Sequence, residues 1–405
     1  MCLQWDPKIT TFPGLYLVSA LFLYPSKMCN VFMLRFISLA ASIVNVYLIQ
    51  SIRATAMKVD TKKMNLNLAL ETLTIAILPP MYFFAHLYYT DVISITTILG
   101  VILFSQKKYH TFAAVCGCFS VLMRQTNIVW ICMVLGSSIV DKMVTSVFPK
   151  ENLTNISPHQ LISTVKAHLK NPKLLFNQLL RILLEFYGYI LIIINFIIFL
   201  VKNGSIVVGD KSAHEATLHL PQILYFTLFV LIFAPTMWIP RLFQIKKIFT
   251  NRKLMITCVV LLIVIGVIIK FNTLVHPYML ADNRHYTFYI WNRFYGKYHL
   301  ARYIVIPVYI FGLISIWKAM EQNTIGFKVL FIVALFMSLS LQRLIEVRYF
   351  LIPFLFLRLN MKSCCRKLTL LELISYLVIN GLTFYLFFTK EIRWKNYSEP
   401  QRIIW

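Results

Sequence analysis

Apolar stretches, each about as long as a membrane-spanning helix, occupy most of this 405-residue chain. Hydrophobic residues make up 59% of the chain and charged residues 14%, whereas a soluble domain carries about 25% charged residues. The mean hydropathy is +0.71. Such a chain cannot cover its apolar stretches with a polar surface, so most of them must face lipid or other buried helices. The composition therefore predicts an all-α, polytopic transmembrane protein and excludes a soluble enzyme or a disordered regulator.

The apolar stretches predict about twelve membrane spans, because a spanning helix needs about 20 mostly apolar residues and tolerates about 17. The predicted spans are 30–50, 66–86, 92–105, 110–124, 127–140, 183–201, 222–239, 254–271, 303–317, 327–341, 349–360 and 368–388. The segment 14–24 is too short to span and is expected to lie in the interface or to re-enter the membrane. We expect a single multispanning domain over residues 1–405.

The charges of the loops predict which side of the membrane each loop faces, since Lys and Arg are enriched in short cytosolic loops. Alternate loops beginning with 51–65 hold 23 of the 40 Lys and Arg residues, and the other loops with both termini hold 16. The first set, which includes the long loop 141–182, is predicted to be cytosolic. The start of the chain (1–29) and the loops 202–221 and 272–302 are predicted to be lumenal.

The cytosolic loop contains one predicted amphipathic helix. Ser157 and Pro158 form a cap and first-turn pair. Apolar residues then follow at helical spacing: Leu161, Ile162, Val165 and Leu169. With lysines between them, these residues are typical of a helix that lies on the bilayer surface.

The formal net charge is +25, yet it does not indicate a nucleic-acid partner. A basic patch that binds phosphate backbones needs a soluble surface, which this chain lacks. More of the cations lie on the exterior side than topology requires, and the runs GDKSAHEATLHLP and HPYMLADNRHYTFY lie there too. An ordinary solvated loop explains any one of these polar segments. It explains less well why they all lie on the same side of the membrane. We therefore expect polar chemistry on one face of the membrane.

The loop 202–221 contains a His-Glu pair that fails as a zinc motif. The histidines of H-E-x-x-H stand four residues apart so that both face one metal, whereas His214 and His219 stand five apart. We predict no metal site. Asp210 and Glu215 form either a capped turn that opens the next helix or an acid/base group at the interface.

The loop 272–302 contains Asn283, Arg284 and His285 in succession, followed by Tyr286. A planar amide, a forked guanidinium and an aromatic face suit sugar hydroxyls and phosphate oxygens. The alternative is an ordinary loop in an interfacial aromatic belt. Four consecutive hydrogen-bonding side chains are more than a belt requires, so we favour a binding site.

Two further arginines lie at exterior turns. Arg124 begins Arg-Gln-Thr-Asn between two apolar stretches, where an arginine is costly unless it is paired or extends to the interface. Arg348 lies two residues after Glu346. That pair is either a structural ion pair or a clamp for a lipid head group, and its spacing does not distinguish the two.

Five runs follow one another along the chain. They are WDPKITT with PGLY (5–16), RQTNIVW (124–130), GDKSAHEATLHLPQ (209–222), LADNRHYTFYIW (280–291) and EVRYFLIP (346–353). Together they resemble the dolichyl-phosphate-glucose-dependent α-1,2-glucosyltransferases of N-glycan precursor assembly. The resemblance implies a GT-C glycosyltransferase of the endoplasmic reticulum membrane. Such an enzyme adds the third, terminal glucose to a diglucosylated oligosaccharide on dolichyl pyrophosphate, on the lumenal face and without a nucleotide cofactor.

The implied reaction inverts the anomeric carbon, from a β-linked donor to an α product. It requires a carboxylate that takes the proton of the acceptor hydroxyl and cations that hold the departing dolichyl phosphate. The candidate bases are Asp210 and Glu215, with Asp6 as third choice. The candidate substrate and phosphate contacts are Arg284, Arg124, His285, Asn283, Arg348 and His214.

The resemblance departs at the start of the chain. Family members begin with an extra span and a lumenal loop that bears an acidic pair, and a carboxylate of that loop is the usual base candidate. This chain starts inside the loop, at the Trp-Asp-Pro run. The alternative to an active enzyme is therefore a shortened, non-catalytic membrane protein that binds lipid-linked ligands or other membrane proteins. A transporter is a weaker alternative, because no inverted-repeat halves are visible.

Overall fold

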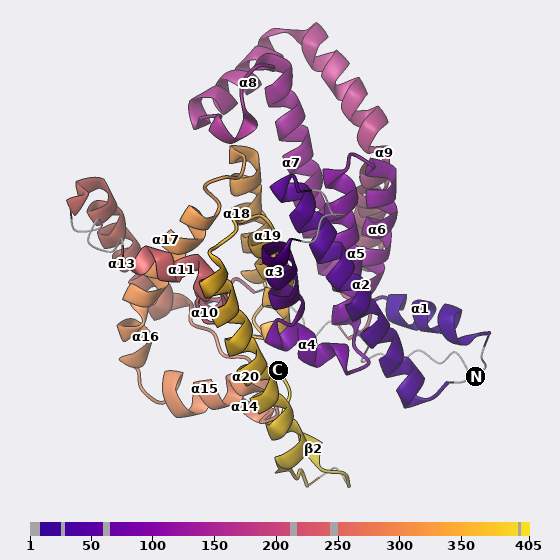
Figure 1. The fold of residues 1–405 in the computed structure, drawn as a ribbon, viewed down its shortest axis with the longest axis vertical. Helices are drawn as coiled ribbons and strands as arrows, with labels where there is room; N and C mark the ends of the chain where they lie inside the picture. Colours follow the sequence, from indigo (N-terminus) through magenta and orange to yellow (C-terminus); the bar gives the residue numbers. More distant parts are fainter. Residues whose placement is uncertain (1–8, 26–28, 60–64, 211–216, 244–249, 396–397) are drawn as a thin grey trace. The chain divides into compact units, whose positions relative to one another are not determined.

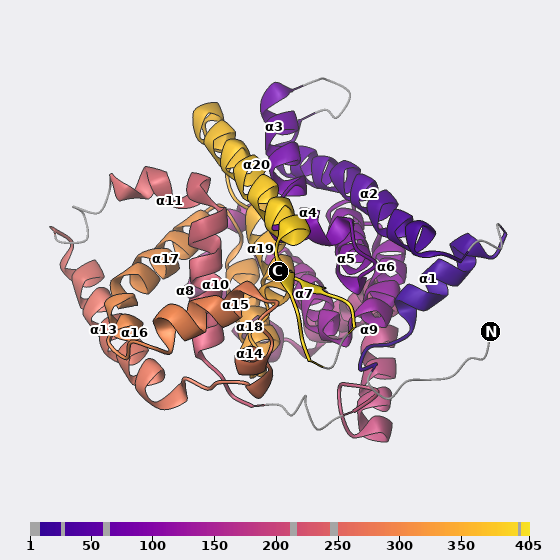
Figure 2. The same ribbon diagram turned by 90° about the horizontal axis from the view of Figure 1, so that it is seen from below.

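The computed structural model describes most of the chain as helices (Figures 1 and 2). The described residues are 9–25, 29–59, 65–210, 217–243, 250–395 and 398–405. The chain forms two compact units. The first comprises Met1–Lys63, Ala85–Glu215 and Gln322–Met337, and the second comprises Met64–Phe84, Ala216–Glu321 and Ser338–Trp405. The prediction of a helical fold is confirmed, and the expected single domain stays a prediction.

Six helical segments among the described residues are long and apolar enough to cross a membrane. They are α2 (Val31–Met57), Gln125–Val147 with α7 (Ile128–Val147), α9 (Pro172–Asn203), α13 (Arg252–Asn272), Ala301–Ala319 with α16 (Ala301–Ile304) and α17 (Ile306–Ala319), and α20 (Arg366–Thr389). The protein is therefore a multi-pass membrane protein.

Two bent helix pairs are each either a broken span or a re-entrant loop, and the number of candidate spans is eight if each pair counts as one span. One pair is α3 (Leu66–Ala76) with α4 (Pro79–Ala85), bent by 68°, and the other is α10 (Pro221–Phe233) with α11 (Pro235–Leu242), bent by 85°. A proline starts the second helix of each pair. Proline lacks a backbone N–H and disfavours helical geometry in the residue before it, so each helix is interrupted there.

The remaining predicted spans form shorter helices. These are α5 (Thr90–Gln106), α6 (His110–Met123), α18 (Ile325–Leu339) and the nine-residue α19 (Leu351–Leu359), which follows the 3-10 turn η5 (Val347–Phe350). Every predicted span thus contains a helix. Only six to eight of these helices or helix pairs, among the described residues, are long and apolar enough to cross a membrane. The total of about twelve predicted spans is larger because several stretches were counted at a length below that of an ordinary spanning helix.

The first unit packs α5 between α2 and α6, and α1 (Gly14–Leu23) lies against α6. Gly14 allows this close contact, because a Cβ atom there would lie 2.4 Å from the carbonyl oxygen of Leu122. The predicted amphipathic helix is confirmed as α8 (Pro158–Lys170). Ser157 and Gln160 cap it reciprocally, each side chain accepting a bond from the other's backbone N–H.

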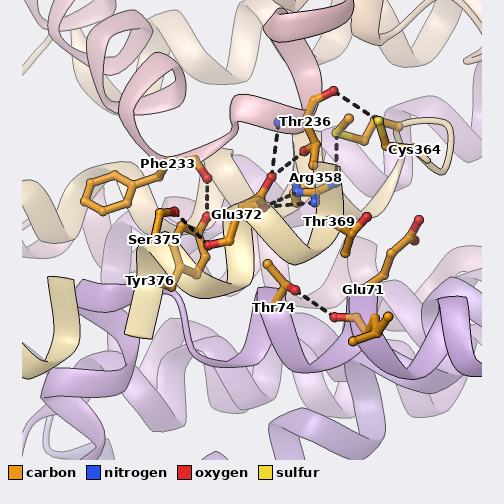
Figure 3. A network of polar contacts seen from close by, with 12 residues as sticks. Glu71, Thr74, Phe233, Thr236, Arg358, Cys364, Thr369, Glu372, Ser375 and Tyr376 are labelled. Atoms are coloured by element: carbon orange, nitrogen blue, oxygen red, sulfur yellow. Dashed lines mark hydrogen bonds and ion pairs between the residues drawn. The ribbon is translucent and has the colours of Figure 1, made fainter. Parts of the chain in front are cut away.

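The second unit is held together by a buried ion pair that the sequence analysis did not predict (Figure 3). Arg358 of α19 donates to Oε1 of Glu372 of α20 at 2.9 Å, and the two side chains are 2% and 1% exposed. The other carboxylate oxygen accepts bonds from the backbone N–H and hydroxyl of Thr236 at the start of α11. One carboxylate therefore joins three helices, with Tyr376 hydrogen-bonded beside it.

A short β-hairpin follows α20 and was also missed by the prediction of a purely helical fold. Its antiparallel strands β1 (Glu391–Ile392) and β2 (Gln401–Arg402) pair Glu391 with Arg402 and Ile392 with Gln401. We call residues 391–405 the C-terminal hairpin. Figures 1 and 2 show α14 (Pro277–Ala281) and α15 (Tyr286–Ile290) beside this end of the chain.

Candidate active site

The Asn-Arg-His run lies in the four-residue connection between α14 and α15. Asp282 ends α14, and its Oδ1 accepts the backbone N–H of Arg284 at 3.0 Å. An aspartate side chain that bonds the backbone two residues on closes a local turn. The same carboxylate accepts Nε of Arg284 at 2.9 Å and Nη2 at 2.7 Å. This forked pair fixes the plane of the guanidinium relative to the turn.

The two residues after Asp282 that flank Arg284 are bonded to the C-terminal hairpin. Oδ1 of Asn283 accepts Nε1 of Trp394 at 2.8 Å. Nδ1 of His285 lies 3.1 Å from the carbonyl oxygen of Trp405. Asn283 and His285 therefore serve to connect the loop to the hairpin, and both were predicted as substrate contacts.

A cavity of about 770 Å³ opens beside Arg284 and lies entirely within the second unit. Its size falls in the range of small-molecule sites, about 300–1,000 Å³. Charged and ionisable residues line it: the carboxylates Asp282 and Glu346, the cations Arg284, Arg393 and Lys395, and His285. Tyr278 and Trp394 add aromatic surface. Because the cations outnumber the carboxylates, the cavity suits an anionic ligand that also carries an apolar or sugar group.

The Arg284 guanidinium sets the protonation state of its partner. Burial raises the pKa of the Asp282 carboxyl, but the hydrogen bonds and the positive charge of Arg284 outweigh burial and hold that pKa below its usual value. Asp282 therefore stays ionised at neutral pH. Both carboxylate oxygens of Asp282 already accept bonds from Arg284, so neither is placed to take a proton from a ligand, and the role that fits Asp282 is to orient Arg284.

Glu346 is the second carboxylate of the cavity, and it accepts a bond from Arg348 at Oε2. The carboxylate and the guanidinium are 17% and 15% exposed. Arg348 also lies over the ring of Phe84, with its Cζ 5.9 Å from the ring centroid. The two residues form the ion pair that was one of the two alternatives from the sequence, and Glu346 rather than Arg348 lines the cavity.

Arg124 lies in the first unit, where it forms an ion pair with Asp91 at 3.2 Å. Asp91 is 3% exposed. An arginine at this depth is costly unless it is paired, and Arg124 is paired here, while its expected contact with a phosphate stays a prediction. Nearby, Nδ2 of Asn127 donates to Oγ of Ser94 at 2.7 Å and to Oγ of Ser120 at 2.9 Å. These bonds connect the turn to α5 and α6.

Of the predicted bases, the structure describes Asp210 alone, and Asp210 is not among the residues that line the cavity. Asp210 is exposed and belongs to the first unit. Asp6, His214 and Glu215 lie outside the described residues. Within the described parts of the chain, no group of three or more His, Cys, Asp or Glu side chains is placed to hold a metal ion.

Sequence reasoning missed four cavity residues as site candidates: Asp282, Glu346, Arg393 and Lys395. A signal existed for each of them. Asp282 directly precedes the Asn-Arg-His run, and Glu346 precedes Arg348 at an exterior turn. Arg393 and Lys395 flank a tryptophan just after the last predicted span.

The sequence model of the DIE2/ALG10 family matches residues 2–359. The chain belongs to the DIE2/ALG10 family. This confirms the resemblance found in the sequence. The matched range includes Arg124, Arg284 and Glu346 and ends before the C-terminal hairpin.

Curated relatives of the DIE2/ALG10 family cover nearly the whole chain. A Drosophila melanogaster protein named Dol-P-Glc:Glc(2)Man(9)GlcNAc(2)-PP-Dol alpha-1,2-glucosyltransferase is 45% identical over 99% of this chain and 89% of its own length. A Homo sapiens protein of the same name is 36% identical over 99% of this chain and 88% of its own. An Arabidopsis thaliana protein of that name is 30% identical, covering 99% and 91%. No solved structure matches the chain.

Proposed function

We propose that this chain transfers glucose from dolichyl phosphate glucose to the diglucosylated oligosaccharide Glc2Man9GlcNAc2 carried on dolichyl pyrophosphate. The new linkage is α-1,2, and the added glucose is the third and last. The observation that carries this proposal is the 45% identity, over 99% of the chain, to a protein named for that reaction. The charged cavity of the second unit supports it independently, since both substrates are anionic lipids with sugar head groups.

The proposed enzyme is of the GT-C type, with about twelve spans in the endoplasmic reticulum membrane and its active face in the lumen. A dolichyl phosphate donor cannot leave the bilayer, so the bond between sugar and phosphate must be broken at the interface. Cavity residues come from the predicted lumenal loop 272–302, from the turn at Glu346 and from the segment after α20. By the loop charges, all three segments lie on the same predicted side.

The cations of the cavity are proposed to hold the donor phosphate. Negative charge grows on the dolichyl phosphate as its bond to the anomeric carbon breaks, and fixed cations lower the free energy of that transition state. Arg284 is the central candidate, because Asp282 orients it, and Arg393 and Lys395 line the same cavity. Arg124, Arg348, Asn283, His285 and His214 remain proposed contacts from the sequence.

Glu346 is proposed as the general base. In one displacement, the acceptor hydroxyl oxygen attacks the anomeric carbon, Glu346 takes the hydroxyl proton, and dolichyl phosphate leaves with the bonding electron pair. The bond from Arg348 is made to Oε2, so Oε1 is the atom proposed to take the proton. Asp210, Glu215 and Asp6, the bases proposed from the sequence, are the alternatives.

Neutral variants of the four carboxylates test the base assignment. Glu346→Gln, Asp210→Asn, Glu215→Gln and Asp6→Asn are expressed at equal level in cells that lack this glucosyltransferase, and the triglucosylated lipid-linked oligosaccharide is measured. Loss of a general base costs about 10²–10⁴-fold in rate, so Glu346→Gln is expected to lose at least about 100-fold. Glu151→Gln, at an exposed site of the predicted cytosolic loop, is the control. Full activity of Glu346→Gln would assign the base to whichever other variant is inactive.

A further inference from the structure

The C-terminal hairpin makes contact with the Arg284 guanidinium on two sides. Its Gln401 accepts Nη1 of Arg284 at Oε1, at 3.1 Å. The ring of Trp394 faces the guanidinium, with the Arg284 Cζ 4.6 Å from the ring centroid. Asp282 occupies the remaining edge, through Nε and Nη2. The guanidinium is thus held by the carboxylate of Asp282, the amide of Gln401 and the ring of Trp394. The amide and the ring come from the hairpin.

Main-chain bonds place the hairpin in register with the same loop. The backbone N–H of Ile404 donates to the carbonyl oxygen of Arg284 at 2.9 Å, and a parallel bridge pairs His285 with Ile404. The hairpin is also fixed to the helix before it. Arg402 donates from Nη1 to the carbonyl oxygen of Phe388 at 2.9 Å and pairs with Glu391 at 3.2 Å. The hairpin therefore connects the end of α20 to the Arg284 loop.

Fixing an arginine side chain has a measurable benefit for binding. An arginine loses rotamer entropy when it is immobilised, and a ligand that must order the side chain binds less tightly by the corresponding free energy. In this protein the side chain is already ordered by its contacts with Asp282, Trp394 and Gln401. Gln401 is a neutral acceptor, so it orients the guanidinium without cancelling its charge.

We propose that Trp394 and Gln401 are positioning residues that hold Arg284 at the cavity for the phosphate of the lipid-linked donor. The proposal rests on the proposed function. It goes beyond the family assignment, because the hairpin lies outside the matched residues 2–359. Trp394 contributes to the cavity wall as well, together with its neighbours Arg393 and Lys395.

The substitutions Gln401→Ala and Gln401→Glu together separate a positioning role from a structural one. A carboxylate at this position accepts the Nη1 bond more strongly than an amide does, so the fold keeps or gains stability. It also places a second negative charge beside the Arg284 guanidinium, so an anionic donor binds less tightly. Gln401→Ala removes the Nη1 bond without adding charge, so weaker binding by Gln401→Ala at an unchanged melting temperature shows that the amide positions Arg284. Weaker binding by Gln401→Glu then shows that the charge at Arg284 acts on the ligand.

Equilibrium binding of radiolabelled dolichyl phosphate glucose to the purified full-length protein in detergent provides the measurement. Gln401→Glu is expected to weaken binding about tenfold, with an unchanged or higher melting temperature. Trp394→Leu is expected to weaken it about tenfold by loss of the stacked face. Trp317→Leu, at an exposed tryptophan of α17, is the matched control and is expected to bind like the wild type.

An Arg284→Lys background tests whether the hairpin acts through Arg284. Lysine cannot make the forked contacts, so Gln401→Ala and Trp394→Leu are expected to change donor affinity less than twofold in this background, because paired residues are non-additive. The inference would be overturned if the hairpin variants and Arg284→Lys lowered donor affinity additively, or if Gln401→Glu and Trp394→Leu both bound donor like the wild type. Either outcome would leave the proposed function standing. If Trp394→Leu does not accumulate, Gln401→Glu decides. A wild-type chain that binds no donor would overturn the proposed function, and the inference with it.

Discussion

The Arg284 guanidinium and the Asp282 carboxylate form a forked ion pair, with bonds of 2.9 Å from Nε and 2.7 Å from Nη2, in the loop between α14 and α15. The pair lies at the wall of a cavity that also contains Glu346. It is partly exposed to solvent. A ligand can therefore reach the arginine while the carboxylate keeps it in place.

Replacing Asp282 by asparagine is expected to weaken donor binding although it removes a negative charge from an anion site. Asparagine offers one acceptor oxygen where the carboxylate offers two, so the guanidinium loses its fixed orientation. We expect the KM for dolichyl phosphate glucose to rise about tenfold in a membrane transferase assay. Glu151→Gln, which neutralises an exposed carboxylate far from this loop in sequence and leaves the ion pair intact, is the comparison. A KM below the wild-type value would show that charge matters more than orientation.

The buried pair of Arg358 and Glu372 is expected to determine stability and not catalysis. Removing one partner from a buried ion pair costs about 3–5 kcal/mol because the other charge stays buried alone. Glu372→Leu and Arg358→Leu should each lower the melting temperature and the amount of protein in the membrane. The double variant should recover part of that loss, since no unpaired charge remains. Equal instability of the double variant would contradict this account.

His219 is expected to make the second unit sensitive to acid. Its side chain is fully buried and packs against Tyr225, and burial lowers its pKa from 6.5 to about 4. Between these values the unfolded chain binds a proton that the folded chain does not, so the free energy of unfolding falls as pH decreases from about 6.5 to 4. The loss is about 3 kcal/mol for 2.5 pKa units.

Melting temperatures at pH 7.5 and pH 5 test this prediction on purified protein. The shift between the two values should be smaller for His219→Phe than for the wild type. His299→Phe replaces an exposed histidine and serves as the control. An identical pH shift in all three proteins would assign the acid sensitivity to other groups.

Arg124 and Arg284 are expected to respond differently to the same substitution. Arg124 pairs with the buried Asp91, so Arg124→Gln removes an ion pair from a buried carboxylate, and protein abundance should fall together with glucose transfer. Arg284→Gln should lose transfer at normal abundance, because Asp282 keeps contact with solvent. Quantitative immunoblotting of membranes beside the oligosaccharide assay separates the two effects. Normal abundance with lost transfer in Arg124→Gln would support the phosphate contact that was predicted from the sequence.

The sequence predicted the helices well because membrane helices are specified by local composition. Each predicted span contains a helix, and the capped helix after Ser157 begins where Pro158 predicted it. The number of full spans was less predictable. The bends at Pro79 and Pro235 follow from the prolines, which a hydropathy window does not score. The short lengths of α5 and α6 depend on packing, which such a window does not measure either.

The candidate site was predicted in part, again for physical reasons. Arg284 stood out because three polar side chains adjoin it in one exterior loop. Its partners Trp394 and Gln401 are more than 100 residues away in sequence. Contacts between residues so far apart in sequence depend on the fold, and no local sequence pattern predicts them. The Arg358–Glu372 pair was also not predicted, because its members belong to different helices and meet only when α19 and α20 pack together.

The most direct test of the proposed donor site is glucose transfer by Arg284→Ala. The variant and the wild-type chain are expressed at equal membrane abundance in cells that lack this glucosyltransferase, and their lipid-linked oligosaccharides are separated by size. We predict that the wild type restores the triglucosylated species and that Arg284→Ala leaves the diglucosylated species. Retention of more than about a tenth of wild-type transfer, a change of less than about 1.4 kcal/mol in the barrier, would contradict the assignment of Arg284 to the donor phosphate.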